Sequence, residues 1–249
     1  MSGPPRILSI AGSDSSGGAG IQADIKTVTM LGGYAMTAIT AITAQNTLGV
    51  TRVEVLSPEM VAAQMDACAS DIGIDAVKIG MLGSPAIAAV VAERLEALAV
   101  PVVFDPVMIA SSGSVLADAA TIAGFERLMA LATLITPNVA ELAVLGGDAG
   151  LAARGFAYLA KGGDAEGDVI EDRLVLPGQQ AVVWQAARIV TRHNHGTGCT
   201  LSSAIATLLG KGLALETAVT EARQFVRAAL AAAPRFGHGH GPLGHQAVR

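Results

Sequence analysis

Short segments rich in Val and Ile alternate with Ala-rich stretches of helical length along most of the chain, and this alternation restricts the possible folds more than any other feature. Segments such as 6–11 and 100–107 are apolar at mostly consecutive positions, which is typical of strands buried on both faces of a sheet. An aromatic content of only 3% within a hydrophobic content of 51% fits such strands between Ala-rich helices. We therefore predict an α/β protein in which residues 1–249 form one domain.

The composition argues against several classes of partner. Apolar runs are interrupted by charges or glycines, as at Glu126 and Arg127, before they reach the roughly 18 residues that a membrane span needs. A formal net charge of −5 without a basic tract argues against nucleic acid. Cys68 and Cys199 have no metal-ligand spacing, and the N-terminal run is too short for a signal peptide. We expect a cytoplasmic protein with no membrane partner, no nucleic-acid partner and no disulfide framework.

A glycine turn, His195-Gly196-Thr197-Gly198-Cys199-Thr200, stands directly before the apolar segment 201–209, which we predict to be helical. A helix N-terminus presents unpaired N–H groups and partial positive charge, and glycines let the backbone approach an anion closely. The turn is therefore predicted to bind a phosphate or an oxyanion. Cys199 lies in the first helical turn, where a thiolate is favoured. The alternative is a structural loop with a small buried cysteine.

A second glycine-rich loop, 12–20, connects the first predicted strand to a helix predicted over 21–31. A strand, a glycine loop and a helix in succession favour a ligand site at the carboxyl end of the sheet. Gly12 and Gly17 have the spacing of a P-loop, but Gly18 stands where that motif needs its lysine. We expect the loop to approach an uncharged ligand, with Asp24, just inside the helix, available as a hydrogen-bond partner.

Four further polar residues follow predicted strands. Gln45 offers a paired donor and acceptor that suit the edge of an aminopyrimidine, or it caps a turn. Asp105, fixed by the proline after it, is a candidate metal or substrate carboxylate, or a loop cap. Asn138 and Glu141 share one face of a helix start, where they could hold water around a magnesium ion or form an ordinary capping pair.

The C-terminal part of the chain is less regular. Segment 142–154 is short for a crossover helix, and 173–176 and 181–189 are predicted to be antiparallel edge strands around a Pro-Gly turn. A final helix is predicted from about 215 to 233. The Gly- and His-rich tail 237–242 has the composition of a disordered segment.

Seven motifs occur along the chain in a fixed order. They are Ala11-Gly12-Ser13-Asp14 with Gly17-Gly18-Ala19-Gly20-Ile21-Gln22-Ala23-Asp24, Thr43-Ala44-Gln45-Asn46-Thr47, Lys78-Ile79-Gly80-Met81-Leu82, Asp105-Pro106-Val107-Met108, Thr136-Pro137-Asn138 with Glu141, Lys161-Gly162-Gly163, and the turn 195–200. In this order the chain resembles, nearly end to end, the hydroxymethylpyrimidine and phosphomethylpyrimidine kinases of thiamin biosynthesis. Each motif is weak alone, and the ordered set is specific.

The resemblance implies a three-layer α/β/α ribokinase-like fold with a mostly parallel central sheet flanked by helices. It implies ATP-dependent phosphorylation of 4-amino-5-hydroxymethyl-2-methylpyrimidine and then of its monophosphate, with ATP and Mg²⁺ required and a homodimer expected. By position, the resemblance places site residues in four groups: Gly12, Asp24, Gln45, Met81 and Val107 at the pyrimidine; Gly196, Thr197, Gly198 and Cys199 in the anion hole; Asn138 and Lys161 at the nucleotide phosphates; and Asp105 and Glu141 at the metal. Cys199 would replace the aspartate base of sugar kinases.

Three departures from the family pattern concern the nucleotide side. Asp164 stands where the family usually has His, segment 142–154 is shorter than usual, and Ser111 and Ser112 stand where a lysine is common. A pyridoxine or pyridoxal kinase on the same scaffold and a catalytically silent pyrimidine-binding module are the alternative functions. For the kinase, our hypothesis is that Cys199 assists the loss of the alcohol proton in the first step. The second nucleophile, a phosphate, is already largely ionised and needs less help.

Overall fold

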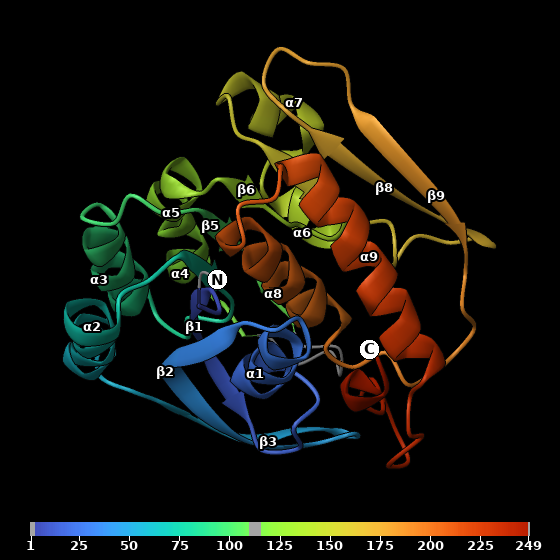
Figure 1. The fold of residues 1–249 in the computed structure, drawn as a ribbon, viewed down its shortest axis with the longest axis horizontal. Coiled ribbons are helices and arrows are strands. Elements are labelled where there is room, and N and C mark those ends of the chain that lie inside the picture. Colours follow the sequence, from blue (N-terminus) through green and yellow to red (C-terminus); the bar gives the residue numbers. More distant parts are fainter. Residues whose placement is uncertain (1–2, 110–115, 249) are drawn as a thin grey trace.

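The structure is a computed structural model that describes residues 3–109 and 116–248. Within these residues the strands form a single nine-stranded sheet in the order β3-β2-β1-β4-β5-β6-β7-β8-β9 (Figure 1). The strands are β1 (Arg6–Asp14), β2 (Tyr34–Asn46), β3 (Gly49–Val55), β4 (Ala76–Ile79), β5 (Val102–Phe104), β6 (Leu134–Ile135), β7 (Tyr158–Ala160), β8 (Val169–Val175) and β9 (Val182–Ala187). Strands β2, β1, β4, β5, β6 and β7 are parallel, whereas β3, β8 and β9 extend the two edges in antiparallel pairs. The predicted mostly parallel sheet and its antiparallel edge hairpin are confirmed.

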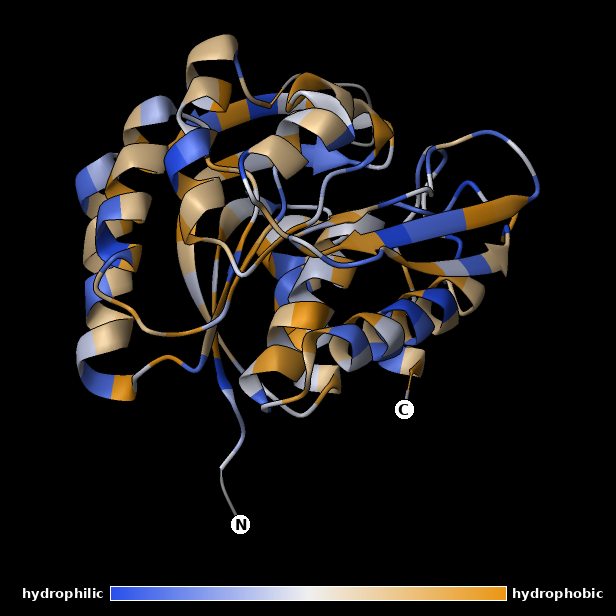
Figure 2. Ribbon diagram, turned by 90° about the horizontal axis from the view of Figure 1, so that it is seen from above, coloured by the Kyte–Doolittle hydropathy of each residue, from blue (hydrophilic) through white to orange (hydrophobic). Residues whose placement is uncertain are grey.

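Helices cover both faces of the sheet and give three layers (Figures 1 and 2). The helical elements are α1 (Gly20–Met30), α2 (Pro58–Ala67), the π-helical turn η1 (Cys68–Ile72), α3 (Pro85–Leu95), α4 (Ala119–Ala123), α5 (Phe125–Leu131), α6 (Val139–Val144), α7 (Gly147–Ala153), α8 (Thr197–Gly210), α9 (Leu215–Ala231) and the 3-10 turn η2 (His245–Ala247). Helices α2, α3 and α5 pack on one face, and α1, α8 and α9 on the other. No helix in the described part of the chain is both long and apolar enough to cross a membrane.

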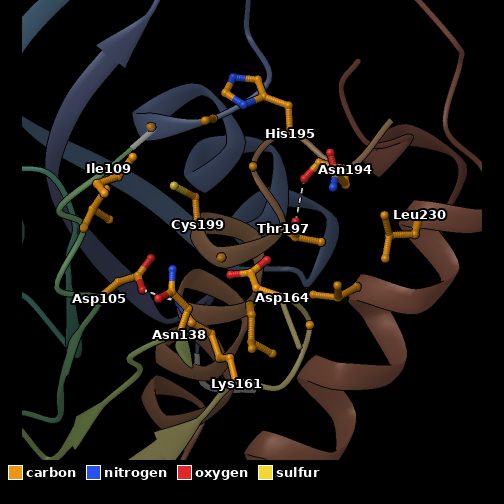
Figure 3. Close-up of a pocket in the computed structure, with 18 of the residues that line it drawn as sticks. Asp105, Ile109, Asn138, Lys161, Asp164, Asn194, His195, Thr197, Cys199 and Leu230 are labelled. Carbon is orange, nitrogen blue, oxygen red and sulfur yellow. Dashed lines mark hydrogen bonds and ion pairs between the residues drawn. The ribbon is translucent and has the colours of Figure 1, made fainter. Parts of the chain in front are cut away.

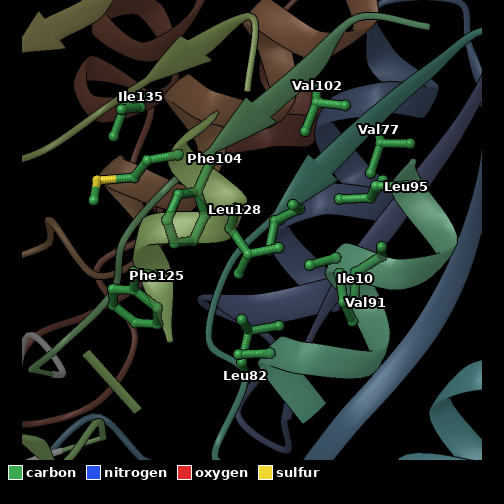
Figure 4. Close-up of a cluster of buried hydrophobic side chains, with 14 of the residues drawn as sticks. Ile10, Val77, Leu82, Val91, Leu95, Val102, Phe104, Phe125, Leu128 and Ile135 are labelled. Atoms are coloured by element: carbon green, nitrogen blue, oxygen red, sulfur yellow. The ribbon is translucent and has the colours of Figure 1, made fainter. Parts of the chain in front are cut away.

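Each face of the sheet has its own apolar core. On the α3 and α5 side, Phe104 of β5 meets Phe125 edge to face, with ring centroids 5.1 Å apart, and Leu128 and Val91 pack nearby (Figure 4). On the other face the small residues of α8 are buried, which lets this helix lie between the sheet and helices α1 and α9. The first turn of α8 thereby lies where the parallel strands end.

Local sequence signals explain several helix starts. Ser57 and Ser84 each accept a hydrogen bond from a backbone N–H three residues on, and a proline follows each of them. These are the N-cap and N1-proline signals of a helix start. Asn138 and Glu141 form a complete capping box at α6, so the capping role left open above is confirmed.

One expected strand boundary is wrong, and the helices between β5 and β7 are short and divided. Strand β1 continues to Asp14 instead of ending at Ala11, so the glycine loop begins within the strand. The short segment 142–154 belongs to two short helices, α6 and α7, which together replace one long crossover helix. Helices α4 and α5 are separated at Gly124, and Ser111 and Ser112 lie outside the described residues.

The tail 237–242 is packed against the body of the protein, contrary to the disorder that its composition suggested. The His240 N–H donates to the Thr47 carbonyl at 2.8 Å, and the His195 N–H donates to the Gly241 carbonyl at 3.0 Å. A Cβ at Gly239 would lie 2.1 Å from the Thr47 carbonyl oxygen, and one at Gly241 2.1 Å from Nδ1 of His193. The glycines therefore serve close backbone contact between the tail, the β2–β3 turn and the loop before α8.

Candidate active site

A cavity of about 450 Å³ opens at the carboxyl ends of the parallel strands (Figure 3). Its walls come from the loops after β1, β4, β5 and β6, from the start of α8, and from the β8–β9 and α9 side of the molecule. This is the edge of an open α/β sheet at which ligands bind. The described residues thus hold a cavity at the place that the glycine loops predicted.

The two glycine loops are in direct contact at this cavity. Gly196 has a φ of +88°, and a Cβ there would lie 1.9 Å from the carbonyl oxygen of Gly18. Nε2 of His195 lies 2.8 Å from the Asp14 carboxylate, which also accepts the Ala19 N–H at 2.9 Å. The loop after β1 and the N-terminus of α8 therefore form one continuous wall of the cavity, although they are far apart in sequence.

The N-terminus of α8 faces the cavity without a side-chain cap. Gly196 is its N-cap residue, in the left-handed conformation, and no side chain in the described residues caps this end. Thr197, Gly198 and Cys199 line the cavity, so the positive end of the helix dipole is directed into it. An anion of the size of a phosphate can bind such a helix end.

A charged cluster lies against Gly198. A Cβ at this position would be 3.3 Å from Nζ of Lys161 and 3.5 Å from the Asp105 carboxylate. Lys161 Nζ is 2.7 Å from Asp105 and 3.9 Å from Glu141, and the Thr136 hydroxyl donates to Asp105 at 3.0 Å (Figure 3). The structure thus brings together the four residues expected at the phosphates and metal, since Asn138 lines the same part of the cavity.

The donor set in this cluster fits a magnesium ion. Two carboxylates and an amide oxygen are hard oxygen donors, of the kind that bind Mg²⁺ together with water and substrate phosphates. Burial raises the pKa of Glu141 to about 7, and Lys161 opposes this shift while Asp105 adds to it. One lysine therefore does not fully offset both carboxylates, and a bound divalent cation would favour the ionised form of Glu141.

We predict that Glu141 makes the fold less stable as the pH rises from about 4.5 to about 7. In the unfolded chain this carboxyl ionises near 4.5, whereas in the folded protein it keeps its proton until about 7. Between these values unfolding releases a proton, so the free energy of unfolding falls with rising pH. Urea unfolding of the wild type and of Glu141→Gln across this range measures the effect, because glutamine keeps the capping-box pattern but has no charge to lose.

The unfolding free energies of the wild type and of Glu141→Gln should diverge progressively as the pH rises above 4.5, and Glu141→Gln should be the more stable protein at pH 7. Glu59→Gln is the matched control, because Glu59 is an exposed acid in the first turn of α2. The prediction is wrong if the wild type and Glu141→Gln keep a constant difference over the whole range.

Most residues expected at the pyrimidine line the same cavity. Gly12, Gln45, Met81 and Val107 all contribute to its wall. A Cβ on Gly12 would lie 3.1 Å from Sδ of Met81, so glycine at this position leaves room for the Met81 side chain. The cavity is therefore lined by apolar and amide side chains as well as by the charged cluster.

Asp24 is not a cavity residue, and its expected role as a polar reader of the ligand is not supported. Its side chain is fully buried between β1, β4 and α8, where Lys78 Nζ lies 2.9 and 3.0 Å from its two oxygens. The hydroxyls of Ser9 and Ser203 also donate to this carboxylate. With four hydrogen bonds inside the protein, Asp24 holds elements together beneath the site instead of facing a ligand.

Cys199 lines the cavity, but the expectation of a favoured thiolate is wrong. Burial raises the pKa of its thiol to about 11, although the nearby Lys78 cation acts in the opposite direction. Asp24 and Asp105 add negative charge that disfavours the thiolate. In the ligand-free site Cys199 is therefore a neutral thiol at physiological pH.

The sequence reasoning missed several cavity residues. Asp14 and His195 lie inside quoted motifs but were given no role, because their pairing joins residues 181 positions apart. On the α9 side, Ile170, Val226 and Leu230 line an apolar part of the cavity, and no local motif marks them. Arg188 donates to the carbonyl groups of Gly163, Ala165 and Gly167 and so holds the loop after Lys161 in place.

Comparison with known proteins gives concordant matches in sequence and structure. The family profile described as phosphomethylpyrimidine kinase matches residues 14–244. The hydroxymethylpyrimidine/phosphomethylpyrimidine kinase of Rhizobium meliloti is 48% identical over 255 residues, covering 96% of each chain. The enzyme of the same name from Synechococcus elongatus is 44% identical over 255 residues, covering 97% of each chain.

Two solved structures share the fold. Phosphomethylpyrimidine kinase from Clostridium difficile has a TM-score of 0.76 at 38% identity, covering 90% of this chain and 98% of that one. Pyridoxal kinase from Bacillus subtilis, in an ADP complex, has a TM-score of 0.88 at 33% identity, covering 99% of both chains. The fold is thus shared by kinases named for two different ring substrates.

Proposed function

The chain belongs to the phosphomethylpyrimidine kinase family, and from this premise we propose how its cavity carries out the two phosphorylations. The protein is an ATP-dependent kinase of thiamin biosynthesis that phosphorylates 4-amino-5-hydroxymethyl-2-methylpyrimidine and then its monophosphate. The observation that supports this most strongly is the uncapped N-terminus of α8, with Lys161 and Asp105 against Gly198, in a cavity that Gln45 and Met81 also line. We place the reaction in the cytoplasm.

In this proposal the pyrimidine lies at the Gln45 end, and ATP enters from the α9 side. The apolar surface of Ile170, Val226 and Leu230 accepts the adenine, and the phosphates reach the backbone N–H groups of residues 197–199. Asn138 and Lys161 lie at the phosphates. The ADP complex solved for the related pyridoxal kinase supports a nucleotide site in this fold.

Phosphoryl transfer passes through a loose transition state, so the protein contributes mainly positioning and charge neutralisation. The substrate hydroxyl oxygen bonds to the γ-phosphorus as the bond from that phosphorus to the bridging oxygen breaks, and ADP leaves. The N-terminus of α8 and Lys161 stabilise the charge on the transferred group. Asp105 and Glu141 would hold Mg²⁺, which when bound neutralises phosphate charge.

Coupled measurement of ADP release tests the activity directly. The hydroxymethylpyrimidine should give ADP in the presence of ATP and Mg²⁺, and its monophosphate should give ADP in a second reaction. A silent binding module would show a thermal shift with the pyrimidine and no ADP release. Phosphate transfer to neither pyrimidine would overturn the proposal.

Pyridoxal kinase activity is the second candidate, because the pyridoxal kinase from Bacillus subtilis has a higher TM-score than the phosphomethylpyrimidine kinase from Clostridium difficile. The same assay with pyridoxal as acceptor separates the two functions by the ratio of kcat/KM values. We expect the ratio to favour the pyrimidine, since the Gln45 amide can pair with an aminopyrimidine edge.

Replacement of Cys199 by alanine should slow phosphorylation of the alcohol by about 10²-fold and slow the second phosphorylation less. Only the thiolate form of Cys199 can accept the alcohol proton, so the thiol must first release its own proton to solvent, whereas the phosphate acceptor of the second step is already largely ionised at neutral pH. Single-turnover rates for the two acceptors measure the difference. Cys68→Ala, at the other cysteine, is the control and should leave both rates unchanged, and equal losses in both steps for Cys199→Ala would contradict this division.

We also propose that the protein is a homodimer that associates through the β2–β3 ribbon. Ile42, Leu48, Val53 and Val55 on this ribbon are 50%, 68%, 40% and 42% exposed, and β3 is an edge strand. Exposed apolar side chains beside an unpaired strand edge are typical of an association surface. Sedimentation velocity should show a dimer at micromolar concentration and a monomer for Leu48→Asp; a monomeric wild type would refute the proposal.

A further inference from the structure

The side chain of Gln45 has two polar neighbours inside the protein. Its amide nitrogen lies 3.2 Å from Nε2 of His195, and its amide oxygen lies 3.0 Å from the Thr43 hydroxyl. Gln45 lines the cavity, so the atoms that face these neighbours also decide which atoms remain for a ligand. The protons available on His195 and Thr43 can therefore fix the orientation of the amide.

His195 carries a proton on Nε2. This nitrogen is 2.8 Å from the carboxylate of Asp14, which is almost fully buried. Burial alone would raise the pKa of Asp14, but hydrogen bonds from His195 and Ser16 outweigh burial and lower it. An ionised carboxylate only accepts hydrogen bonds, so Nε2 must donate to it. A nitrogen that donates to Asp14 cannot also accept from the Gln45 amide nitrogen.

Thr43 is compatible with the same result. Its single hydroxyl hydrogen can go to the backbone carbonyl of Ser13, which lies 3.0 Å away. The Thr43 oxygen is then free to accept a hydrogen bond from Gln45. Both neighbours are accommodated when the Gln45 amide is turned over. Its carbonyl oxygen then faces His195 and shares the Nε2 hydrogen with Asp14, and its nitrogen donates to Thr43.

We propose that Asp14, His195 and Thr43 are positioning residues that hold the Gln45 amide in this turned orientation and thereby determine ring specificity. The remaining lone pair of the Gln45 oxygen, on the His195 side, accepts from an exocyclic amine. The remaining amide hydrogen, on the Thr43 side, donates to the neighbouring ring nitrogen. If a ring carried an oxygen acceptor in place of the amine, that oxygen would face the Gln45 amide oxygen, and neither atom could donate a hydrogen bond to the other.

This inference depends on the proposed function only in the identity of the ring, because the orientation of Gln45 belongs to the ligand-free protein. His195 also directly precedes Gly196 in the chain. The residue whose imidazole orients Gln45 is thus the chain neighbour of the N-cap of α8.

The tautomer of His195 is the first test. Long-range ¹H–¹⁵N correlation spectra of the ligand-free protein distinguish a protonated from a bare Nε2, and His195→Gln identifies the signals among the five histidines. We expect the hydrogen on Nε2. A bare Nε2 with the hydrogen on Nδ1 would overturn the inference, whether or not the protein phosphorylates any pyrimidine.

Specificity is the second test. Thr43→Val removes the acceptor of the Gln45 N–H and keeps the shape, so the preference in kcat/KM for the hydroxymethylpyrimidine over pyridoxal should fall by about 3- to 10-fold, mainly through a higher KM for the pyrimidine. Thr43→Ser retains the hydroxyl and should restore the wild-type ratio. An unchanged ratio in Thr43→Val, or an equal loss in Thr43→Ser, would refute the role of Thr43.

The role of Asp14 is tested by comparing a variant of Asp14 with a variant of Ser16, which lies in the same loop. Asp14→Asn replaces one carboxylate oxygen by a donor, weakens the bond from His195, and should lower the same specificity ratio. Ser16→Ala also removes a hydrogen bond to Asp14, at 2.8 Å, but does not touch His195. The ratio should therefore be preserved in Ser16→Ala, and an equal change in both variants would attribute the effect to the loop and overturn the inference.

Discussion

Replacement of Gly196 by alanine is expected to lower kcat by about 10²- to 10³-fold, the range observed when a preorganised donor to a developing charge is lost. Two effects act together at this position. The left-handed φ of +88° is costly for a residue with a Cβ, and that Cβ would lie 1.9 Å from the Gly18 carbonyl oxygen. The backbone must move away from the opening loop, and the N–H groups of residues 197–199 move with it.

Gly212→Ala separates the clash from the backbone strain. Gly212 has a nearly equal φ of +85°, and a Cβ there would have no atom within 4 Å, so alanine costs roughly 1 kcal/mol of stability and leaves activity intact. Steady-state kinetics and urea unfolding of both variants give the comparison. If Gly196→Ala folds and keeps a kcat close to that of the wild type, the N-terminus of α8 does not bind the transferred phosphate.

Replacement of Lys78 by methionine is expected to cost about 3–5 kcal/mol of unfolding free energy. Lys78 and Asp24 are both fully buried, and the lysine donates to both carboxylate oxygens. Burial alone would lower the pKa of Lys78, but its acidic neighbours, Asp24 foremost, outweigh burial and raise it, so the lysine is held as a cation. Methionine fills a similar volume and leaves Asp24 as a buried charge without a counter-charge.

The double variant Lys78→Met with Asp24→Asn tests this explanation, because it removes both charges and should recover at least half of the lost stability. Arg94→Met is the surface control. Its partner Asp66 is 56% exposed, and loss of that pair should cost no more than about 1 kcal/mol. Equal destabilisation by Lys78→Met and Arg94→Met would contradict the buried-pair interpretation.

The sequence was sufficient for the architecture because its signals act over short distances. Apolar strand segments, serine caps before prolines and the two glycine loops each involve a few neighbouring residues, and the structure confirms the resulting elements. Because the central strands are parallel, their carboxyl ends also lie at the same edge of the sheet. The cavity therefore lies where Gly12, Asp105 and Gly196–Cys199 were expected to meet.

The errors arose where a residue's role depends on a partner remote in the chain. Asp24 was expected at the ligand, because nothing near it in sequence indicates Lys78, 54 residues away. Cys199 was expected as a thiolate from its place in a helical turn, but burial beside Asp24 and Asp105 decides its pKa. The tail looked disordered because its glycines are also what allow it to pack against Thr47 and His193.

The sequence by itself determined the alternation of strands and helices, the family, and the glycine turn before α8. The tertiary structure alone decided which carboxylates face the cavity, which are neutralised inside the protein, and how Asp14, His195 and Thr43 orient Gln45. The physical reason is that local backbone preferences depend on residues that are neighbours in the sequence. Charge states and hydrogen-bond directions depend instead on burial and on distances between residues that only folding brings together.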